Sequence, residues 1–83
     1  MTTNSMKLYK LIILYFLHKA KQEITNATLS DFILKYGYTN YFSIQETLAD
    51  LTEDNMIHTS QTHAASYYTI ADKGLETLQF FSY

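Results

Sequence analysis

The segment "YTNYFSIQETLADLTEDN", residues 38–55, decides how the whole chain is interpreted. Its apolar residues recur at the three- and four-residue spacing that brings side chains to one face of a helix. Asn40 and Ser43 can open such a helix, and Asn55 tolerates the left-handed conformation in which helices often end. The segment therefore predicts a helix that begins between Asn40 and Ser43 and ends at Asn55. We expect its buried face to consist of Tyr41, Ile44, Leu48 and Leu51.

Two helices are predicted before this segment. Asn4 or Ser5 can cap the first, which runs to about Ala20. Its inward face is expected to carry the apolar residues that recur at helical spacing: Leu8, Leu11, Ile12, Tyr15 and Phe16. The second helix follows the short extended connector "EITN". Asn26 is its predicted cap, and Gly37 is predicted to end it in the left-handed conformation.

A hairpin and one more helix are predicted after the segment. "MIHTS" and "SYYTI" have the composition of two strands joined by a loop at residues 61–65. Asp72 favours the positive end of a helix dipole and starts a last helix in which Leu75 and Leu78 share a face. The predicted fold is mainly α with a small β-hairpin (α+β), in the order α-(short β)-α-α-β-β-α. This is the order of a winged helix-turn-helix domain.

Several short motifs in the chain resemble those of known winged-helix families. "LADLTEDNMI" and "YYTIADKG" are similar to the recognition-helix end and the return strand of winged-helix regulators of the PadR and MarR types. "YTNYF" and "NYFSIQETLADL" resemble a bacterial family of winged-helix proteins known only as a domain of unknown function, over residues 7–81. The resemblance implies a DNA-binding transcriptional regulator that dimerises through its terminal helices. Members of that family are usually longer, so we expect the N-terminal part of a longer protein or a short member.

Length and composition limit the possible functions. The 83 residues suffice for a single domain, 1–83, and they include six Lys, no Arg and a formal charge of −2. This charge predicts no strong general attraction to phosphate backbones. The absence of Cys excludes disulfides and zinc-thiolate sites. The longest apolar run, Leu11 to Leu17, is too short to span a membrane. We expect a cytoplasmic protein with no membrane partner.

The predicted third helix lacks the basic residues that usually contact DNA. In the PadR-type pattern its outward positions are commonly basic, whereas the matching residues here are Glu46, Ala49 and Asp50. No Lys or Arg occurs from Tyr36 to Asp72, a stretch that includes the predicted wing. Duplex DNA is therefore expected to be a weak partner. The DNA-binding candidates are the remaining polar residues near the helix start and in the wing: Asn40, Ser43, Gln45, Thr47, Gln61, Thr62 and His63.

Catalytic and metal chemistry find no support in the sequence. No Ser, His or Asp lies in a nucleophile elbow, a phosphate loop or a paired-carboxylate spacing, so the chain is not predicted to be an enzyme. His58 and His63 have no thiol nearby, and we predict no metal and no cofactor. The aromatic cluster near the helix turn is interpreted as core or helix-staple residues rather than as a stacking platform for bases: Tyr36, Tyr38, Tyr41 and Phe42.

The first and last helices carry more apolar surface than one core requires. If the inward face of the first helix is as described, its other apolar residues point elsewhere on the helical wheel. In the last helix Phe80 and Tyr83 lie off the face that Leu75 and Leu78 define. Such helices are usually covered on both sides, which predicts a homodimer. The dimer-interface candidates are Ile13, Leu14, Leu17, Phe80 and Tyr83.

Two functions fit the sequence. The first is a winged-helix transcriptional regulator with weak intrinsic DNA affinity. The second is a protein-protein interaction or dimerisation module that kept the fold and lost the electrostatics of DNA binding. Fold alone cannot choose between them. The acids Glu46, Asp50 and Glu53 are central to the choice, because they form either a solvated face or a surface for a partner.

Overall fold

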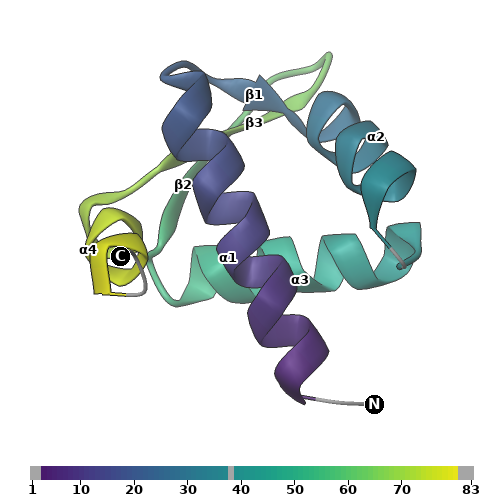
Figure 1. Cartoon of the computed structure of the whole chain (residues 1–83). Coiled ribbons are helices and arrows are strands. Elements are labelled where there is room, and N and C mark those ends of the chain that lie inside the picture. Colours follow the sequence, from purple (N-terminus) through teal and green to yellow (C-terminus); the bar gives the residue numbers. More distant parts are fainter. Residues whose placement is uncertain (1–2, 38, 81–83) are drawn as a thin grey trace.

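The order of elements predicted from the sequence is the order that the structure shows (Figure 1). The structure is a computed structural model, and it describes residues 3–37 and 39–80. The elements in these ranges are α1 Thr3–Ala20, β1 Ile24–Thr25, α2 Asn26–Tyr36, α3 Tyr41–Glu53, β2 Ile57–Gln61, β3 Ser66–Ile70 and α4 Asp72–Phe80. α2 and α3 form the helix-turn-helix, while β2, β3 and the loop between them form the wing. The fold is thus a winged helix-turn-helix domain.

An antiparallel sheet joins the wing to the start of α2. β3 lies between β1 and β2. In the hairpin, Ile57 pairs with Ile70 and Gln61 pairs with Ser66, so the loop at the tip spans residues 62–65. β1 adds two residue pairs on the other edge of β3. Of the connector "EITN", Ile24 and Thr25 are extended as predicted, and their pairing with β3 fixes the position of α2 relative to the wing.

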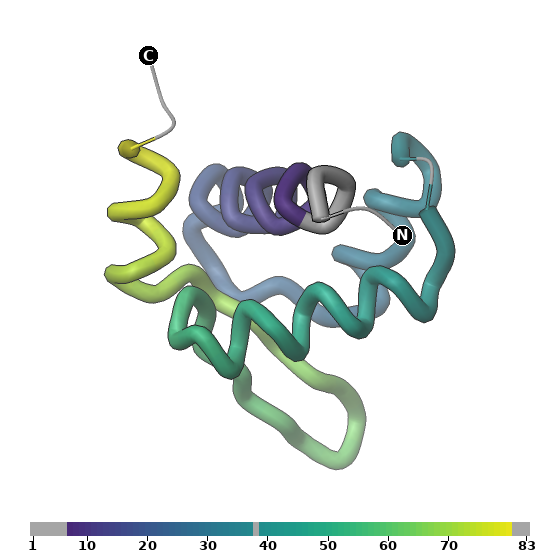
Figure 2. Tube along the Cα trace, turned by 90° about the horizontal axis from the view of Figure 1, so that it is seen from below, coloured from purple at the N-terminus to yellow at the C-terminus, as the bar shows by residue number. Residues whose placement is uncertain are grey.

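The hydrophobic core lies between α1 and the helix α3 with the wing. Figure 2 shows α1 on one side and α3 with the wing on the other. The buried cluster between them consists of Ile13, Leu14, Leu17, Ile24, Leu29, Ile33, Ile44, Leu48, Leu51, Ile57 and Tyr68. Of the predicted buried face of α3, Ile44, Leu48 and Leu51 are confirmed. Tyr41 is wrongly placed in that face, because more than half of its surface is exposed.

The inward face of α1 differs from the predicted one. Ile13, Leu14 and Leu17 are 0%, 1% and 2% exposed, whereas Leu8 and Tyr15 are more than half exposed. The prediction was wrong because α1 is apolar nearly all round, so its own sequence does not specify which side faces the other elements. The aliphatic side chains occupy the interior. Tyr15, whose hydroxyl favours water, lies at the surface.

The start of α3 follows the prediction, whereas the helix ends at Glu53, with Asp54 as its C-cap, rather than at Asn55. Asn40 is its N-cap, and the Asn40 side-chain oxygen accepts a hydrogen bond from the Ser43 backbone N–H at 2.8 Å. After the helix, Asn55 has a φ of 63°, in the left-handed region that Asn tolerates better than most residues. Both ends are therefore set by residues whose preference is local, which explains why the sequence located this helix well.

The ends of α2 depart from the prediction. Thr25, not Asn26, is the N-cap, and its hydroxyl oxygen accepts a hydrogen bond from the Thr28 N–H at 3.1 Å. Asn26 is the first residue of the helix, and its side chain bonds to other elements instead. Gly37 is extended, with a φ of −115°, rather than left-handed. The turn into α3 therefore does not depend on a left-handed glycine.

Gly74 allows α4 to approach the sheet closely. A Cβ atom at this position would overlap the backbone carbonyl oxygen of Met56 and would lie 2.9 Å from Ile70 Cγ1 and 3.0 Å from Leu14 Cδ2. The close packing of α4 therefore depends on the absence of a side chain at Gly74. Because Leu14 belongs to the core, this contact also fixes α4 against α1.

Candidate nucleic-acid interface

α3 is the helix that a winged helix-turn-helix protein would place in the major groove of DNA. Its inner face is buried and carries Ile44, Thr47, Leu48 and Leu51. The opposite side is called here the outer face of α3 and consists of Phe42, Glu46, Ala49, Asp50 and Glu53, spaced three or four residues apart. Asp50 is half-buried and the other four are exposed. α3 contacts the wing through β2, where the hydroxyl oxygens of Thr52 and Thr59 lie 2.9 Å apart.

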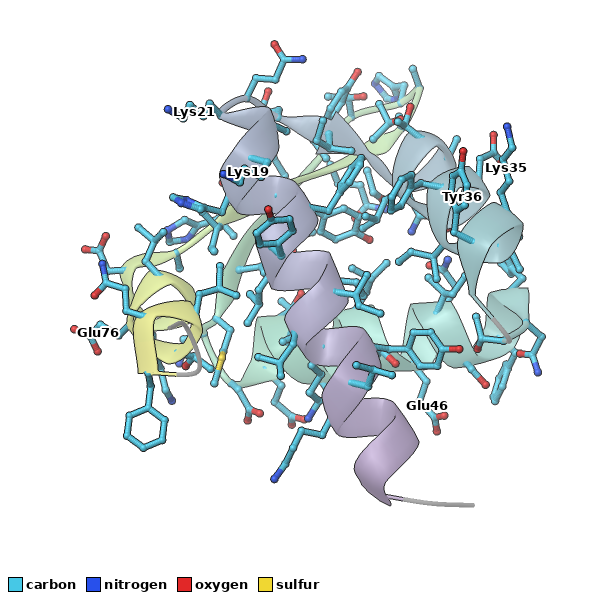
Figure 3. All side chains as sticks on the ribbon, in the orientation of Figure 1. Lys19, Lys21, Lys35, Tyr36, Glu46 and Glu76 are labelled. Atoms are coloured by element: carbon cyan, nitrogen blue, oxygen red, sulfur yellow. The ribbon has the colours of Figure 1, made fainter. Side chains whose placement is uncertain are left out.

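The outer face of α3 is acidic, as the sequence indicated. In Figure 3 Glu46 lies in the lower part of the view, on α3, whereas Lys19 and Lys35 lie in the upper part, on α1 and α2. Within the described part of the chain, the carboxylates of Glu46, Asp50 and Glu53 make no ion pair. DNA docked on this face would therefore bring phosphates toward uncompensated negative charge.

Gln45, a DNA-binding candidate, belongs instead to a polar cluster that joins α2, α3 and β3. The Gln45 and Asn26 amides bond reciprocally: Asn26 Nδ2 donates to Gln45 Oε1 at 2.6 Å, and Gln45 Nε2 donates to Asn26 Oδ1 at 3.1 Å. Gln45 Nε2 also donates to the hydroxyl oxygen of buried Ser30 at 3.0 Å. Asn26 Nδ2 donates in turn to the Tyr68 hydroxyl oxygen at 3.1 Å. Contact between Gln45 and a base would break this cluster, so the structure does not support that prediction.

Thr47 also differs from its predicted role. Its side chain is 3% exposed, and its hydroxyl donates to the Ser43 carbonyl oxygen one turn earlier at 2.8 Å. This local bond satisfies the hydroxyl and permits its burial beside Leu48. The prediction that Thr47 contacts DNA is therefore wrong. At the same end of the helix Asn40 is exposed and Ser43 is half-buried, so these two remain accessible candidates.

The three wing candidates lie together at the tip of the hairpin. Gln61 ends β2, and Thr62 and His63 begin the loop; all three are exposed. The Thr62 hydroxyl oxygen accepts hydrogen bonds from the N–H groups of Ala64 and Ala65, both at 3.2 Å, which holds the loop in a defined turn. The Thr62 side chain thus orders the tip of the wing. The predicted contact residues of this tip offer a partner only neutral polar groups and one imidazole.

The aromatic residues near the α2–α3 turn are at the surface. Tyr36 and Tyr41 are more than half exposed, and Phe42 is 74% exposed, so their interpretation as core residues was wrong. Tyr38 lies outside the described residues. The core beneath these helices is filled instead by aliphatic residues of α1, α2 and α3. Sequence periodicity offered one signal, because Phe42 shares its face with Glu46 and Glu53.

A wide apolar hollow lies on the other side of the domain, between α1, α2 and α4. Its volume is about 710 Å³, and its lining consists of Leu11, Ile12, Tyr15, Phe16, His18, Lys19, Phe32, Leu75, Leu78 and Gln79. The rings of Phe16 and Phe32 stack there with centroids 4.6 Å apart. α1 and α4 therefore do leave apolar surface uncovered in the single chain, as the sequence predicted.

The residues predicted to form that surface were partly wrong. Ile13, Leu14 and Leu17 belong to the intramolecular core and do not line the hollow. The reason is the reversed inward face of α1 described above. Phe80, on α4, is 81% exposed, and its predicted role at a dimer interface stays a prediction. Tyr83 lies outside the described residues.

The described residues gather no metal-binding group. Within 3–37 and 39–80, no three His, Asp or Glu side chains are close enough together to hold a metal ion. In the same ranges, none of the helices combines the length and the apolarity needed to cross a bilayer.

The fold is that of PadR-like winged-helix proteins, as solved structures show. A PadR family transcription regulator from Clostridium difficile matches with a TM-score of 0.73 and 14% identity, over 87% of this chain and 80% of its own. A PadR-like transcriptional regulator from Bacillus cereus matches with a TM-score of 0.69 and 28% identity, over 87% and 75%. Bacillus subtilis PadR in complex with operator DNA matches with a TM-score of 0.72 and 20% identity, over 92% of this chain and 47% of its own.

The chain also matches a sequence family. Residues 9–83 match the family described as "Domain of unknown function (DUF4364)", and the chain belongs to this family. No curated protein sequence matches the chain. The match confirms the resemblance that the motifs around α3 indicated, and it covers nearly the same residues.

Proposed function

We propose that the chain is the winged-helix domain of a transcription regulator whose own affinity for duplex DNA is weak. The regulator class is supported by the PadR-like neighbours, one of which was solved with operator DNA. These neighbours are regulators rather than enzymes, and we propose no catalytic activity. A bacterial regulator acts where the chromosome lies, so the proposed location is the cytoplasm.

The outer face of α3 carries the proposal of weak affinity. Protein–DNA affinity depends strongly on Lys and Arg side chains that neutralise phosphates, and each such contact adds roughly 0.9 to the slope of log affinity against log salt. From Tyr36 to Asp72 the chain has no Lys or Arg, so α3 and the wing supply no such contact. Polar contacts remain possible at the accessible candidates Asn40, Ser43, Gln61, Thr62 and His63. Such contacts position a protein on DNA but neutralise few phosphates.

A titration with duplex DNA of random sequence tests this proposal. At about 0.15 M salt, where nonspecific binding is typically no tighter than micromolar, we expect no sub-micromolar complex. Replacing Glu46→Lys and Asp50→Lys together should raise the affinity and steepen its salt dependence. The matched control is Glu23→Lys with Glu76→Lys, since both residues are exposed and lie off the outer face. Sub-micromolar binding by the unmodified chain, or an equal gain in the control, would contradict the proposal.

We also propose that the chain forms a homodimer through the hollow between α1, α2 and α4. The proposal is supported by the apolar lining of this hollow and by Phe80 on α4. Full burial of one large apolar side chain is worth roughly 1.5 to 3 kcal/mol, so several per subunit can outweigh the cost of association. Sedimentation should then detect a dimer at micromolar concentration, and the thermal midpoint should rise with protein concentration. A monomer with a constant midpoint would contradict this proposal.

A second candidate function is a protein-protein interaction module. It is favoured by the exposed Phe42, which lies on the same acidic face of α3 that disfavours DNA. A winged-helix domain that binds protein through this face would regulate through its partner rather than through direct contact with an operator. The chemistry of such a partner can be inferred from the same face.

A further inference from the structure

We infer that the outer face of α3 is a docking surface for a protein segment that carries Lys or Arg beside apolar side chains. This inference deepens the second candidate function and rests on it, and it is independent of the dimer. It depends on three features of the described residues: an exposed aromatic ring, carboxylates that do not serve the stability of α3, and a hollow beside the helix.

Phe42 is the apolar anchor of this surface. Its side chain is 74% exposed in the first turn of α3, where it stabilises no part of the core. Aromatic residues, Phe among them, are enriched at protein interfaces relative to the rest of the surface. Because Glu46 follows Phe42 by four residues, the ring and the carboxylate lie side by side on the helix surface.

The carboxylates lie where they oppose the stability of the helix. The first turn of α3 has no acidic residue, although acids there would stabilise it. Asp50 and Glu53 occupy the last turn, and Asp54 is the C-cap, next to the negative end of the dipole. Asp50 also lies four residues from Glu46, in a like-charge pair that weakens a helix. Helix stability therefore does not explain these acids, whereas recognition of a cationic partner does.

A shallow hollow lies between the acidic face and the wing. It has a volume of about 520 Å³, and Ala49 and Glu53 of the outer face line it together with Thr59 of β2. Its deeper wall includes the buried residues Leu48 and Tyr68. An apolar side chain of a partner could enter this hollow while a neighbouring Lys or Arg contacts Glu53. The surface thus combines apolar and anionic contacts within reach of one short segment.

The negative charge of the outer face of α3 indicates which kind of partner can bind there. Duplex DNA and an anionic membrane surface would both bring phosphates to Glu46, Asp50 and Glu53, which carry no neutralising ion pair in the described residues. A second copy of this chain has a formal charge of −2, which also disfavours docking on an acidic face. A basic and partly apolar protein segment is the partner for which both the charge and the exposed ring are complementary.

Isotope-edited NMR of the full chain tests the inference with a defined probe. The probe is a synthetic helical peptide with Lys on one face and Leu on the other, and its control has Glu in place of every Lys. We expect the Lys peptide to shift the amide signals of Phe42, Glu46, Ala49 and Glu53 and of Thr59 in the wing. The Glu peptide should leave them unchanged. Shifts confined to the hollow between α1, α2 and α4, or equal shifts with both peptides, would overturn the inference.

Matched variants separate a specific surface from a net-charge effect. Glu46→Gln with Glu53→Gln should weaken binding of the Lys peptide by roughly two- to fivefold per carboxylate, as expected for exposed ion pairs. Glu23→Gln with Glu76→Gln changes the net charge equally but lies off the surface, so it should have little effect. Phe42→Ser should weaken binding by about tenfold or more, as for an interface anchor, whereas Phe80→Ser, at another exposed Phe, should not. Equal losses in test and control variants would overturn the inference.

Duplex DNA provides the last comparison. If duplex DNA shifts the same amide signals and binds more tightly than the Lys peptide at about 0.15 M salt, the face is a nucleic-acid site and the inference is wrong. If neither binds this face, the inference fails while the proposed weak DNA affinity stands. The two proposals can therefore fail separately.

Discussion

Replacement of Gly74 by Ala should destabilise the domain, although Ala is the better helix former. Ala gains up to roughly 1 kcal/mol over Gly in a helix interior. Against this, the new methyl group would overlap the Met56 carbonyl oxygen, which accepts a hydrogen bond from the Ala71 N–H at 3.0 Å. Overpacking typically costs about 1 to 3 kcal/mol, and weakening that hydrogen bond costs about 1 kcal/mol more. We therefore expect a net loss of roughly 1 to 3 kcal/mol.

Thermal unfolding followed by circular dichroism measures this loss. In a domain of this size, each kcal/mol lowers the midpoint by about 4 to 8 °C. The matched control is Lys73→Ala, which introduces the same residue at the preceding, exposed position of α4 and should change the midpoint little. Both variants should be compared at one protein concentration. If Gly74→Ala is as stable as the unmodified chain, then α4 does not pack on the sheet as closely as described.

Three further predictions concern the core, the end of α3 and the apolar hollow. Leu48→Ala should lower the free energy of unfolding by about 2 to 5 kcal/mol in chemical denaturation, because it leaves a cavity in the core. Glu46→Ala should change it by less than about 0.5 kcal/mol. Equal losses would show that the inner face of α3 is assigned wrongly. Asn55→Ala should cost roughly 1 kcal/mol and Asn55→Gly little, because the backbone there is left-handed; the reverse order would rule out that conformation. Tyr15→Glu should produce a monomer of unchanged helical content in sedimentation, since Tyr15 lines the apolar hollow; a persistent dimer would exclude this interface.

The order of elements could be predicted because local preferences mark it. Asn40 caps α3, Asn55 takes the left-handed conformation after it, and Asp72 begins α4. These preferences depend on the backbone within a few residues, and the sequence displays them directly. The wing could be located in the same way, since both strands follow from their composition and the loop between them is short.

The inward face of α1 could not be predicted for the opposite reason. Ile13 and Tyr15 lie on different sides of an almost wholly apolar helix, and either side satisfies a pattern of buried apolar residues. The choice depends on how aliphatic side chains interlock with residues far away in sequence, such as Leu48. It also determined the predicted dimer interface, so one ambiguity caused both errors.

The role of Gln45 was hidden because it depends on three elements at once. Asn26 and Gln45 are 19 residues apart, and their reciprocal hydrogen bonds form only when α2 packs across α3. Taken alone, Asn26 has the properties of a helix cap, and Gln45 has those of a residue that contacts bases. A polar cluster of this kind rigidifies the helix-turn-helix, because each buried polar group requires its partner. It thereby holds the outer face of α3 at a fixed angle to the wing.

The two proposed surfaces lie on opposite sides of the domain, and this arrangement has a consequence for binding. α1, which contributes to the apolar hollow, is on one side in Figure 2, and α3 with the wing is on the other. A dimer formed through the hollow would leave both outer faces of α3 exposed and directed away from the shared interface. A partner with two basic segments would then bind the second face at a high effective concentration, provided that its linker spans the dimer. Dimerisation would thus strengthen a weak single contact without any new contact at the docking surface, which allows the affinity of each face to be modest.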